Sequence, residues 1–257
     1  MKVLRLESPE AVARAAADVL ATEASRSRAA GRELVLGLPT GRTMVPFYDE
    51  LARRHRRRRP PQAQEELDLS RARGLNLDEL LLPVDHPASF HAFMARHAWE
   101  RIGLDRARCD IPDPAADPAA ECARYDRAIA AAGGLDLAFL GIGADGHVAY
   151  NLPGDTRRRT HLIVVPPEVA DTLDVPAACR PLRAITMGFA PLRRARRLVL
   201  LATTPEKARA VRALVEGPED PAWPASLLRR HPRFDVLLTP AAAGELRPRE
   251  RSRLRVR

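Results

Sequence analysis

The sequence predicts an α/β protein whose doubly wound, mainly parallel sheet is the middle layer of a Rossmann-like three-layer sandwich. Short apolar runs that end at glycine or at a carboxylate indicate buried strands, and helical patterns separate them along the chain. Strands that alternate with helices form parallel sheets that are covered on both faces. Because no break in composition divides the 257 residues, we predict one domain over residues 1–246, followed by a basic and mobile tail at 247–257.

Two strand–helix units open the chain. A short edge strand is expected at 4–6. The helix after it begins at Ser8-Pro9-Glu10, which supplies an N-cap, a proline at the first helical position and an acid in the first turn. Gly31 ends this helix. Residues 34–38 form the next buried strand, and residues 45–54 form the helix that follows it.

The loop between this second strand and its helix, Pro39-Thr40-Gly41-Arg42-Thr43, has the composition of a phosphate site. Backbone amides and the N-terminus of a helix attract an anion, and the two threonines add hydroxyl donors. The loop lacks the patterns GK[ST] and GxGxxG, so it does not imply a nucleotide. An ordinary tight turn is the alternative, because many α/β turns share this composition.

The third strand, at 73–77, is followed directly by the carboxylates of Asp78 and Glu79. This order places a carboxylate at the carboxyl end of a strand, where open α/β sheets bind their ligands. The same alternation of elements continues to the C-terminus. We expect helices at 90–102, 119–132, 223–230 and 241–246, and strands at 135–140, 160–165, 184–188, 198–202 and 234–238. We expect loops at 56–66 and 105–118, and an irregular or weakly helical segment at 166–181.

The most informative stretch is the apolar run at 135–140 and the residues that follow it. Glycines bound the run on both sides, which indicates a short buried strand. Gly143, Asp145 and His147 come next, and glycine allows a ligand to approach the backbone closely. Asp145 and His147 are two residues apart, so their side chains point the same way in an extended segment. An aspartate beside a histidine holds one imidazole tautomer and raises its basicity. This pair predicts acid–base catalysis, with a tight turn and a structural histidine as the alternative.

Lys207 is one of only two lysines in the chain, and Lys2 is the other. It lies in the first turn of a helix that begins at Thr204-Pro205-Glu206. A cation at the positive end of a helix is unfavourable unless an anion binds there as well. The position of Lys207 therefore predicts an anion site, with chance retention as the alternative.

Composition argues against several other classes of protein. The net charge of +9 suggests a nucleic acid as partner, but aromatic residues make up only 4%, which leaves few side chains for stacking on bases. No apolar run approaches the roughly 20 residues that cross a bilayer, and the N-terminus does not resemble a signal peptide. The three cysteines form no CxxC pair, so we expect neither a zinc site nor disulfides, and we expect a reduced, cytoplasmic location.

Six motifs occur in order along the chain: GLPTGRT at 37–43, LNLDE at 75–79, HPASFHAFM at 86–94, GIGADGH at 141–147, PEKA at 205–208 and LLRRHP at 227–232. Taken together, they resemble the motifs of one superfamily over about residues 30–245. It comprises the glucosamine-6-phosphate deaminases (isomerases) and their sister family, the 6-phosphogluconolactonases. The two middle motifs, HPASFHAFM and GIGADGH, and the segment VAYN favour the deaminase branch.

The resemblance implies a site and a reaction. The carboxylate that matches Asp78 carries a proton from C2 to C1 of an open-chain sugar phosphate. The histidine that matches His147 promotes ring opening, and the aspartate that matches Asp145 orients it. Neither a metal nor another cofactor is required, and members of the deaminase branch often form homo-oligomers. The substrate and its phosphate are expected to bind at Pro39, Thr40, Gly41, Arg42, Thr43, Gly143 and Lys207.

Two departures from the family pattern keep alternatives open. Deaminases usually have a glutamate where this chain has Leu152, and Asp155 is the nearest stand-in. The usual phosphate-binding arginine has no clear counterpart, although the arginines at 157–159 are substitutes to consider. We therefore expect an aldose–ketose isomerase or deaminase. A 6-phosphogluconolactonase and a sugar-phosphate-binding protein without turnover are the alternatives.

Overall fold

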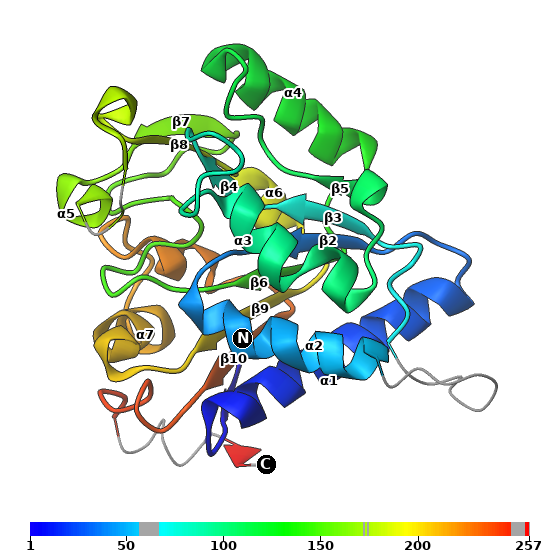
Figure 1. Cartoon of the computed structure of the whole chain (residues 1–257). Coiled ribbons are helices and arrows are strands. Elements are labelled where there is room, and N and C mark those ends of the chain that lie inside the picture. The colour runs from blue at the N-terminus through cyan, green and yellow to red at the C-terminus, as the bar shows by residue number, and fades with distance from the viewer. Residues whose placement is uncertain (57–66, 172, 174, 248–254, 257) are drawn as a thin grey trace.

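The predicted fold class is confirmed by an eight-stranded parallel sheet that forms the middle layer of the molecule (Figure 1). The computed structural model describes residues 1–56, 67–171, 173, 175–247 and 255–256. Across the sheet the strand order is β11-β1-β10-β9-β6-β2-β3-β5. The strands are β1 (Lys2–Arg5), β2 (Val35–Leu38), β3 (Arg73–Asn76), β5 (Cys109–Asp110), β6 (Leu137–Leu140), β9 (Leu198–Ala202), β10 (Phe234–Leu238) and β11 (Arg255–Val256).

Helices cover both faces of this sheet. Alternate residues along each strand point to opposite faces, so Leu137 and Phe139 of β6 pack with α1 and α2, whereas Ala138 and Leu140 pack with α4, α6 and α7. Helices α1 and α2 lie side by side (Figure 1). The helices are α1 (Pro9–Ala29), α2 (Val45–Arg56), α3 (Phe90–His97), α4 (Pro118–Ala131), α5 (Pro167–Ala170), α6 (Phe189–Arg194) and α7 (Ala208–Glu216).

A second, antiparallel sheet lies beside the first and is not predicted by the sequence. It has three strands in the order β4-β8-β7, namely β4 (Asp78–Leu80), β8 (Arg183–Thr186) and β7 (His161–Val164). The two strands expected at 160–165 and 184–188 therefore pair with each other rather than join the main sheet. A separate apolar cluster that includes Leu80, Ile163 and Ala184 supports this small sheet.

Four other expectations differ in detail. The helix expected at 223–230 is a 3₁₀ helix, Pro224–Leu228. The helix expected at 90–102 is α3 followed by a 3₁₀ turn, Trp99–Ile102, because the backbone leaves the helical region at Ala98. The loop expected at 105–118 contains β5. Residues 241–246 form turns rather than a helix.

Some expectations fall largely outside the described residues. Of the loop expected at 56–66, only Arg56 is described, as the last residue of α2. Of the tail at 247–257, Arg247 and β11 are described, and β11 pairs in parallel with β1. No helix in the described ranges is both long and apolar enough to cross a membrane.

The winding of the chain fixes where a ligand site is expected. From β2 the sheet grows outward through β3 to β5, and from β6 it grows the opposite way through β9 and β10 to β1. Strands β2 and β6 are neighbours, so the direction of winding reverses between them. Open α/β sheets bind ligands at such a reversal, outside the carboxyl ends of the strands.

Candidate active site

A cavity of about 560 Å³ lies at these carboxyl ends. It is lined by segments that follow β2, β3, β6 and β9, together with Phe90 from the start of α3. Ten residues are predicted for the site. One of them, Asp145, is hydrogen-bonded to His147 in the cavity wall. The other nine line the cavity themselves, and they are Pro39, Thr40, Gly41, Arg42, Thr43, Asp78, Gly143, His147 and Lys207.

The conformation of the loop after β2 is fixed by its backbone and by two hydrogen bonds. Gly41 has φ of +103°, a conformation that residues with a Cβ atom rarely adopt. Its carbonyl oxygen accepts a hydrogen bond of 2.9 Å from the N–H of Met44, which closes the 3₁₀ turn Arg42–Met44. The hydroxyl of Tyr48 donates to the carbonyl of Pro39 at 2.6 Å. These contacts fix the loop from both ends and leave it as part of the cavity wall.

Two cations stand on the same wall. Arg42 belongs to this loop, and Lys207 is the last residue of a 3₁₀ turn, Pro205–Lys207, that runs directly into α7. Loop amides, threonine hydroxyls and two cations at one cavity are suited to binding a phosphate group. The position of Lys207 at the start of α7 is the one that the sequence predicts.

Asp145 and His147 form a hydrogen-bonded pair at the end of β6. The Nδ1 atom of His147 lies 2.7 Å from Oδ1 of Asp145. Burial favours the protonated carboxyl, but the hydrogen bond and charge of His147 hold the pKa of Asp145 below its usual value. An ionised carboxylate only accepts hydrogen bonds, so Nδ1 of His147 carries the proton and Nε2 is left as an acceptor.

Gly143 makes this pair possible. A Cβ atom at this position would overlap both the Asp145 carboxylate and the His147 ring. The N–H of Gly143 also donates to the carbonyl of His147 at 2.9 Å, so the segment folds back on itself. Glycine is therefore required because two side chains cross the backbone here.

Asp78 is the buried carboxylate of the site. It is 5% exposed, and its Oδ1 atom has no hydrogen-bond partner among the described residues. Burial and the negative charge of Glu79 raise the pKa of Asp78 to about 8. As the sequence predicts, Asp78 follows the carboxyl end of β3, and it also begins β4, because the chain leaves the main sheet and enters the small sheet at this point. A general base works best when its pKa lies near the working pH.

Glu79 connects this carboxylate to α3. Its side chain accepts hydrogen bonds from the backbone N–H groups of Leu80 at 2.7 Å, Phe90 at 2.8 Å and His91 at 2.7 Å. Burial raises the pKa of Glu79 and opposes the effect of these three donors. The contact fixes the first turn of α3, which brings Phe90 to the cavity.

Aromatic side chains line the cavity beside His147, and the sequence does not predict them as site residues. The ring of Tyr150 is parallel to that of His147 within 2°, with centroids 6.1 Å apart. Tyr150 also stacks on Phe90, with ring centroids 5.8 Å apart and an interplanar angle of 16°. The signal for Tyr150 lies in the segment VAYN, which the resemblance already singles out.

Comparison with known proteins agrees with this geometry. A family model for glucosamine-6-phosphate isomerases and 6-phosphogluconolactonases matches residues 7–237. The chain belongs to this family. A glucosamine-6-phosphate deaminase of Corynebacterium aurimucosum is 38% identical over 97% of this chain and 96% of its own length. One of Cellvibrio japonicus is 36% identical over 96% and 92%.

Solved structures of the family give the same result. A monomeric glucosamine-6-phosphate deaminase superposes with a TM-score of 0.85 at 32% identity, over 95% of this chain and 99% of that chain. The 6-phosphogluconolactonase of Leishmania guyanensis has a TM-score of 0.77 at 20% identity, over 96% and 98%. The second likeness concerns the fold alone.

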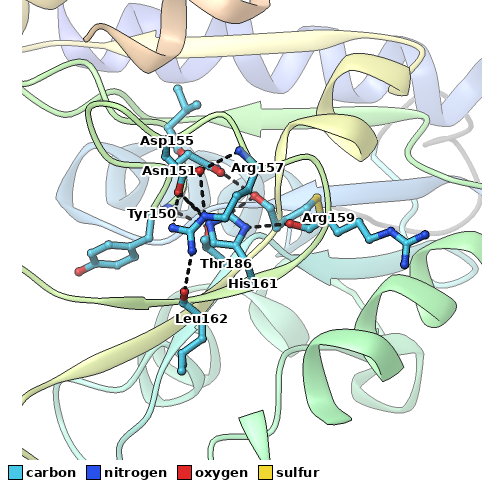
Figure 2. A network of polar contacts seen from close by, with 10 residues as sticks. Tyr150, Asn151, Asp155, Arg157, Arg159, His161, Leu162 and Thr186 are labelled. Carbon is cyan, nitrogen blue, oxygen red and sulfur yellow. Dashed lines mark hydrogen bonds and ion pairs between the residues drawn. The ribbon is translucent and has the colours of Figure 1, made fainter. Parts of the chain in front are cut away.

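The departures from the family pattern lie away from the cavity. Leu152, at the place of the usual glutamate, packs against the apolar cluster of the small sheet. Asp155 is buried and binds Arg157 and His161 (Figure 2), with Nη2 of Arg157 and Nε2 of His161 at 2.7 and 2.9 Å from its Oδ2 atom. The described wall of the cavity includes neither Leu152 nor Asp155 nor any of the arginines at 157–159. None of these residues therefore replaces the missing groups directly.

Proposed function

We propose that this protein converts glucosamine 6-phosphate and water into fructose 6-phosphate and ammonia. The observation that carries the proposal is one cavity wall that holds three functional groups. These are the buried carboxylate of Asp78, whose Oδ1 atom has no hydrogen-bond partner among the described residues, the imidazole of His147 with its Nδ1 atom bound to Asp145, and a phosphate loop together with the cations Arg42 and Lys207. The 38% identical deaminase supports the same reaction.

The phosphate binds at the loop after β2. Loop amides and the hydroxyls of Thr40 and Thr43 donate hydrogen bonds to it, and Arg42 and Lys207 neutralise its charge. Binding there orients the rest of the sugar in the cavity. A fixed orientation lowers the barrier of the later steps, because the reacting atoms need not search for one another.

His147 opens the sugar ring. Its Nε2 atom accepts the proton of the anomeric hydroxyl and returns a proton to the ring oxygen, which yields the open-chain aldehyde. Asp145 holds the required tautomer and stabilises the imidazolium that forms between the two transfers.

Asp78 then moves a proton between two carbons. It takes the proton from C2, and the aldehyde oxygen, O1, gains a proton from the ammonium group at C2, which gives an enolamine. Asp78 returns its proton to C1, and C2 becomes an iminium ion. Water adds to C2 and ammonium leaves, so the product is the 2-ketose phosphate. A base with a raised pKa suits both halves of this transfer.

A lactonase is the second candidate, and the position of Leu152 favours it. Ring opening by a deaminase of this family normally involves a third carboxylate, which this chain lacks at that position. Hydrolysis of a lactone needs only a base that activates water, and the Asp145–His147 pair provides one.

Incubation of the purified protein with glucosamine 6-phosphate tests these candidates. We expect ammonia and fructose 6-phosphate in equal amounts. Asp78→Asn should abolish both product formation and exchange of the C2 proton with solvent, and Lys207→Ala should raise KM about tenfold or more by loss of a charged contact to phosphate.

Three results would contradict the proposal. Hydrolysis of 6-phosphogluconolactone without ammonia from the amino sugar would favour the lactonase. Thermal stabilisation by glucosamine 6-phosphate without product would indicate a binding protein. A fully active Asp78→Asn variant would exclude the proposed proton shuttle.

A further inference from the structure

Tyr150 is held rigidly at the cavity. Its ring lies parallel to the His147 imidazole and to the Phe90 ring, which limits its rotation. Its backbone N–H donates to Oγ1 of Thr186 at 3.0 Å, so the residue is tied to β8 of the small sheet. Figure 2 shows the Tyr150 ring turned away from the Asp155 network.

The turn that presents Tyr150 is unusual. Ala149 has φ of +51°, a left-handed conformation that costs a non-glycine residue of order 1 kcal/mol. The side-chain amide of Asn151 stabilises the turn, because its Nδ2 atom donates to the carbonyls of Val148 at 3.0 Å and Met187 at 2.9 Å. Buried hydrogen bonds on one side therefore maintain a strained backbone that places the ring of Tyr150 in the wall.

The hydroxyl of Tyr150 differs from those of the other two tyrosines. The Tyr48 hydroxyl donates to the carbonyl of Pro39, and the Tyr125 hydroxyl donates to the carbonyl of Asn76. In the part of the chain that the structure describes, the Tyr150 hydroxyl has no such partner. A fixed donor at a cavity wall that is not used within the protein is available to a ligand.

The electrostatic surroundings keep this hydroxyl protonated. Burial and the charge of Asp78 both raise the pKa of Tyr150 above its usual range. Asp78 and Tyr150 line the same cavity. Tyr150 is consequently a hydrogen-bond donor rather than a base at neutral pH.

We propose that the Tyr150 hydroxyl is a catalytic residue, which donates a hydrogen bond to O1 of the open-chain sugar. This inference rests on the function proposed above. When Asp78 takes the C2 proton, the electrons of that bond form the C1–C2 double bond and the carbonyl π electrons move to O1. The donor stabilises the negative charge that develops on O1 and keeps its own proton, since the ammonium group at C2 supplies the proton that completes the O1 hydroxyl.

This role differs from that of the carboxylate missing at position 152. Leu152 carries no polar atom and packs against the small sheet. Tyr150 lies two residues earlier and is in the wall itself. A neutral phenol cannot serve as a base for ring opening, so Tyr150 acts in the enolisation step, and ring opening depends on Asp145 and His147.

The test is Tyr150→Phe, which removes one oxygen atom and keeps the stacked ring. We expect kcat for ammonia release to fall about 100-fold, the effect that removal of one such donor typically has, with KM changed by less than about threefold. Exchange of the C2 proton with solvent should fall in the same proportion. Affinity for glucitol 6-phosphate should stay the same, because this open-chain alcohol develops no charge on O1.

Tyr125→Phe is the matched control. It loses the bond to Asn76 and should lower thermal stability with kcat unchanged, whereas Tyr150→Phe should keep its melting temperature. If wild type and Tyr150→Phe are equally active, the role of Tyr150 is contradicted and the proposed function is not. An equal loss of glucitol 6-phosphate affinity and of kcat also contradicts it, because the hydroxyl would then only bind substrate. A wild type that forms no fructose 6-phosphate contradicts the proposed function itself and the role of Tyr150 with it.

Discussion

Two aspartate–histidine pairs lie close together in the sequence and differ in almost everything else. Asp145 and His147 are joined at 2.7 Å, and their side chains are 46% and 33% exposed. Asp155 and His161 are joined at 2.9 Å, with side chains that are 5% and 10% exposed. The first pair stands at the cavity, and the second is buried at the start of β7 in the small sheet. The same two residue types therefore occupy opposite environments.

The second ring nitrogen decides what each pair does. Nδ1 of His161 lies 2.8 Å from the carbonyl of Arg159, so both of its nitrogens are engaged, and the carboxylate of Asp155 is also bound by Arg157. Such a cluster has no site left for a substrate proton. Nδ1 of His147 is bound to Asp145, and among the described residues its Nε2 atom has no hydrogen-bond partner, which leaves it available for chemistry. A bound aspartate thus makes a histidine catalytic only if its other nitrogen stays free.

The largest effect is expected for Asp145→Asn. The amide no longer holds the proton on Nδ1 of His147, so the imidazole adopts the wrong tautomer. We expect kcat to fall by about 100- to 10,000-fold, with little change in melting temperature because both side chains are partly exposed. Steady-state kinetics and thermal unfolding measure the two quantities. A kcat within about threefold of wild type would show that the open pair is not catalytic.

Asp155→Asn should lower stability and leave kcat unchanged, the opposite of Asp145→Asn. Arg157 and His161 would lose a buried, charged partner, and the free energy of unfolding should fall by about 2–3 kcal/mol at pH 7, with kcat unchanged. Urea unfolding measures this difference. Arg157 and His161 hold the pKa of Asp155 below its usual value even though burial opposes them. The stabilisation is therefore complete above pH of about 4, and it is lost as the pH falls through the lowered pKa.

The exposed pair of Asp171 and Arg180 supplies a control for this variant. Its side chains are 64% and 40% exposed, and ion pairs of this kind contribute between about 0 and 1 kcal/mol. Asp171→Asn should change the unfolding free energy by less than about 1 kcal/mol. Equal losses in the two variants, or a large loss of kcat in Asp155→Asn, would remove the distinction between the buried and the open pair.

The sequence predicts the strands of the main sheet well because buried parallel strands are continuous apolar runs, as in β6 and β9. It does not predict β5, which has only two residues and no such run. The alanines at 241–243 suggest a helix, because alanine has a high helix propensity. Hydrogen bonds from the N–H groups of Ala242 and Ala243 to Thr239 form turns instead.

Contacts in the site between residues close in sequence are also predictable, whereas contacts between distant segments are not. Asp145 and His147 are two residues apart, so their contact is predictable from spacing alone. The stacking of Phe90 on Tyr150 joins segments sixty residues apart, and it depends on the contact between Glu79 and α3. Asp155 has the right residue type to replace a missing carboxylate. Only the fold shows that its partners hold it away from the cavity.

The smallest predicted effect concerns Asp78, a third carboxylate, whose Oδ1 atom has no hydrogen-bond partner among the described residues. Its pKa of about 8 implies that kcat/KM rises about tenfold between pH 7 and 9. Glu79→Gln removes a neighbouring negative charge and should move this rise to lower pH. The amino group of the substrate also titrates, but it is common to both proteins, so only the displacement between profiles reports on Asp78. Glu33→Gln, at the amino end of β2, should cause no displacement. Coincident profiles for wild type and Glu79→Gln would mean that Asp78 is not the base.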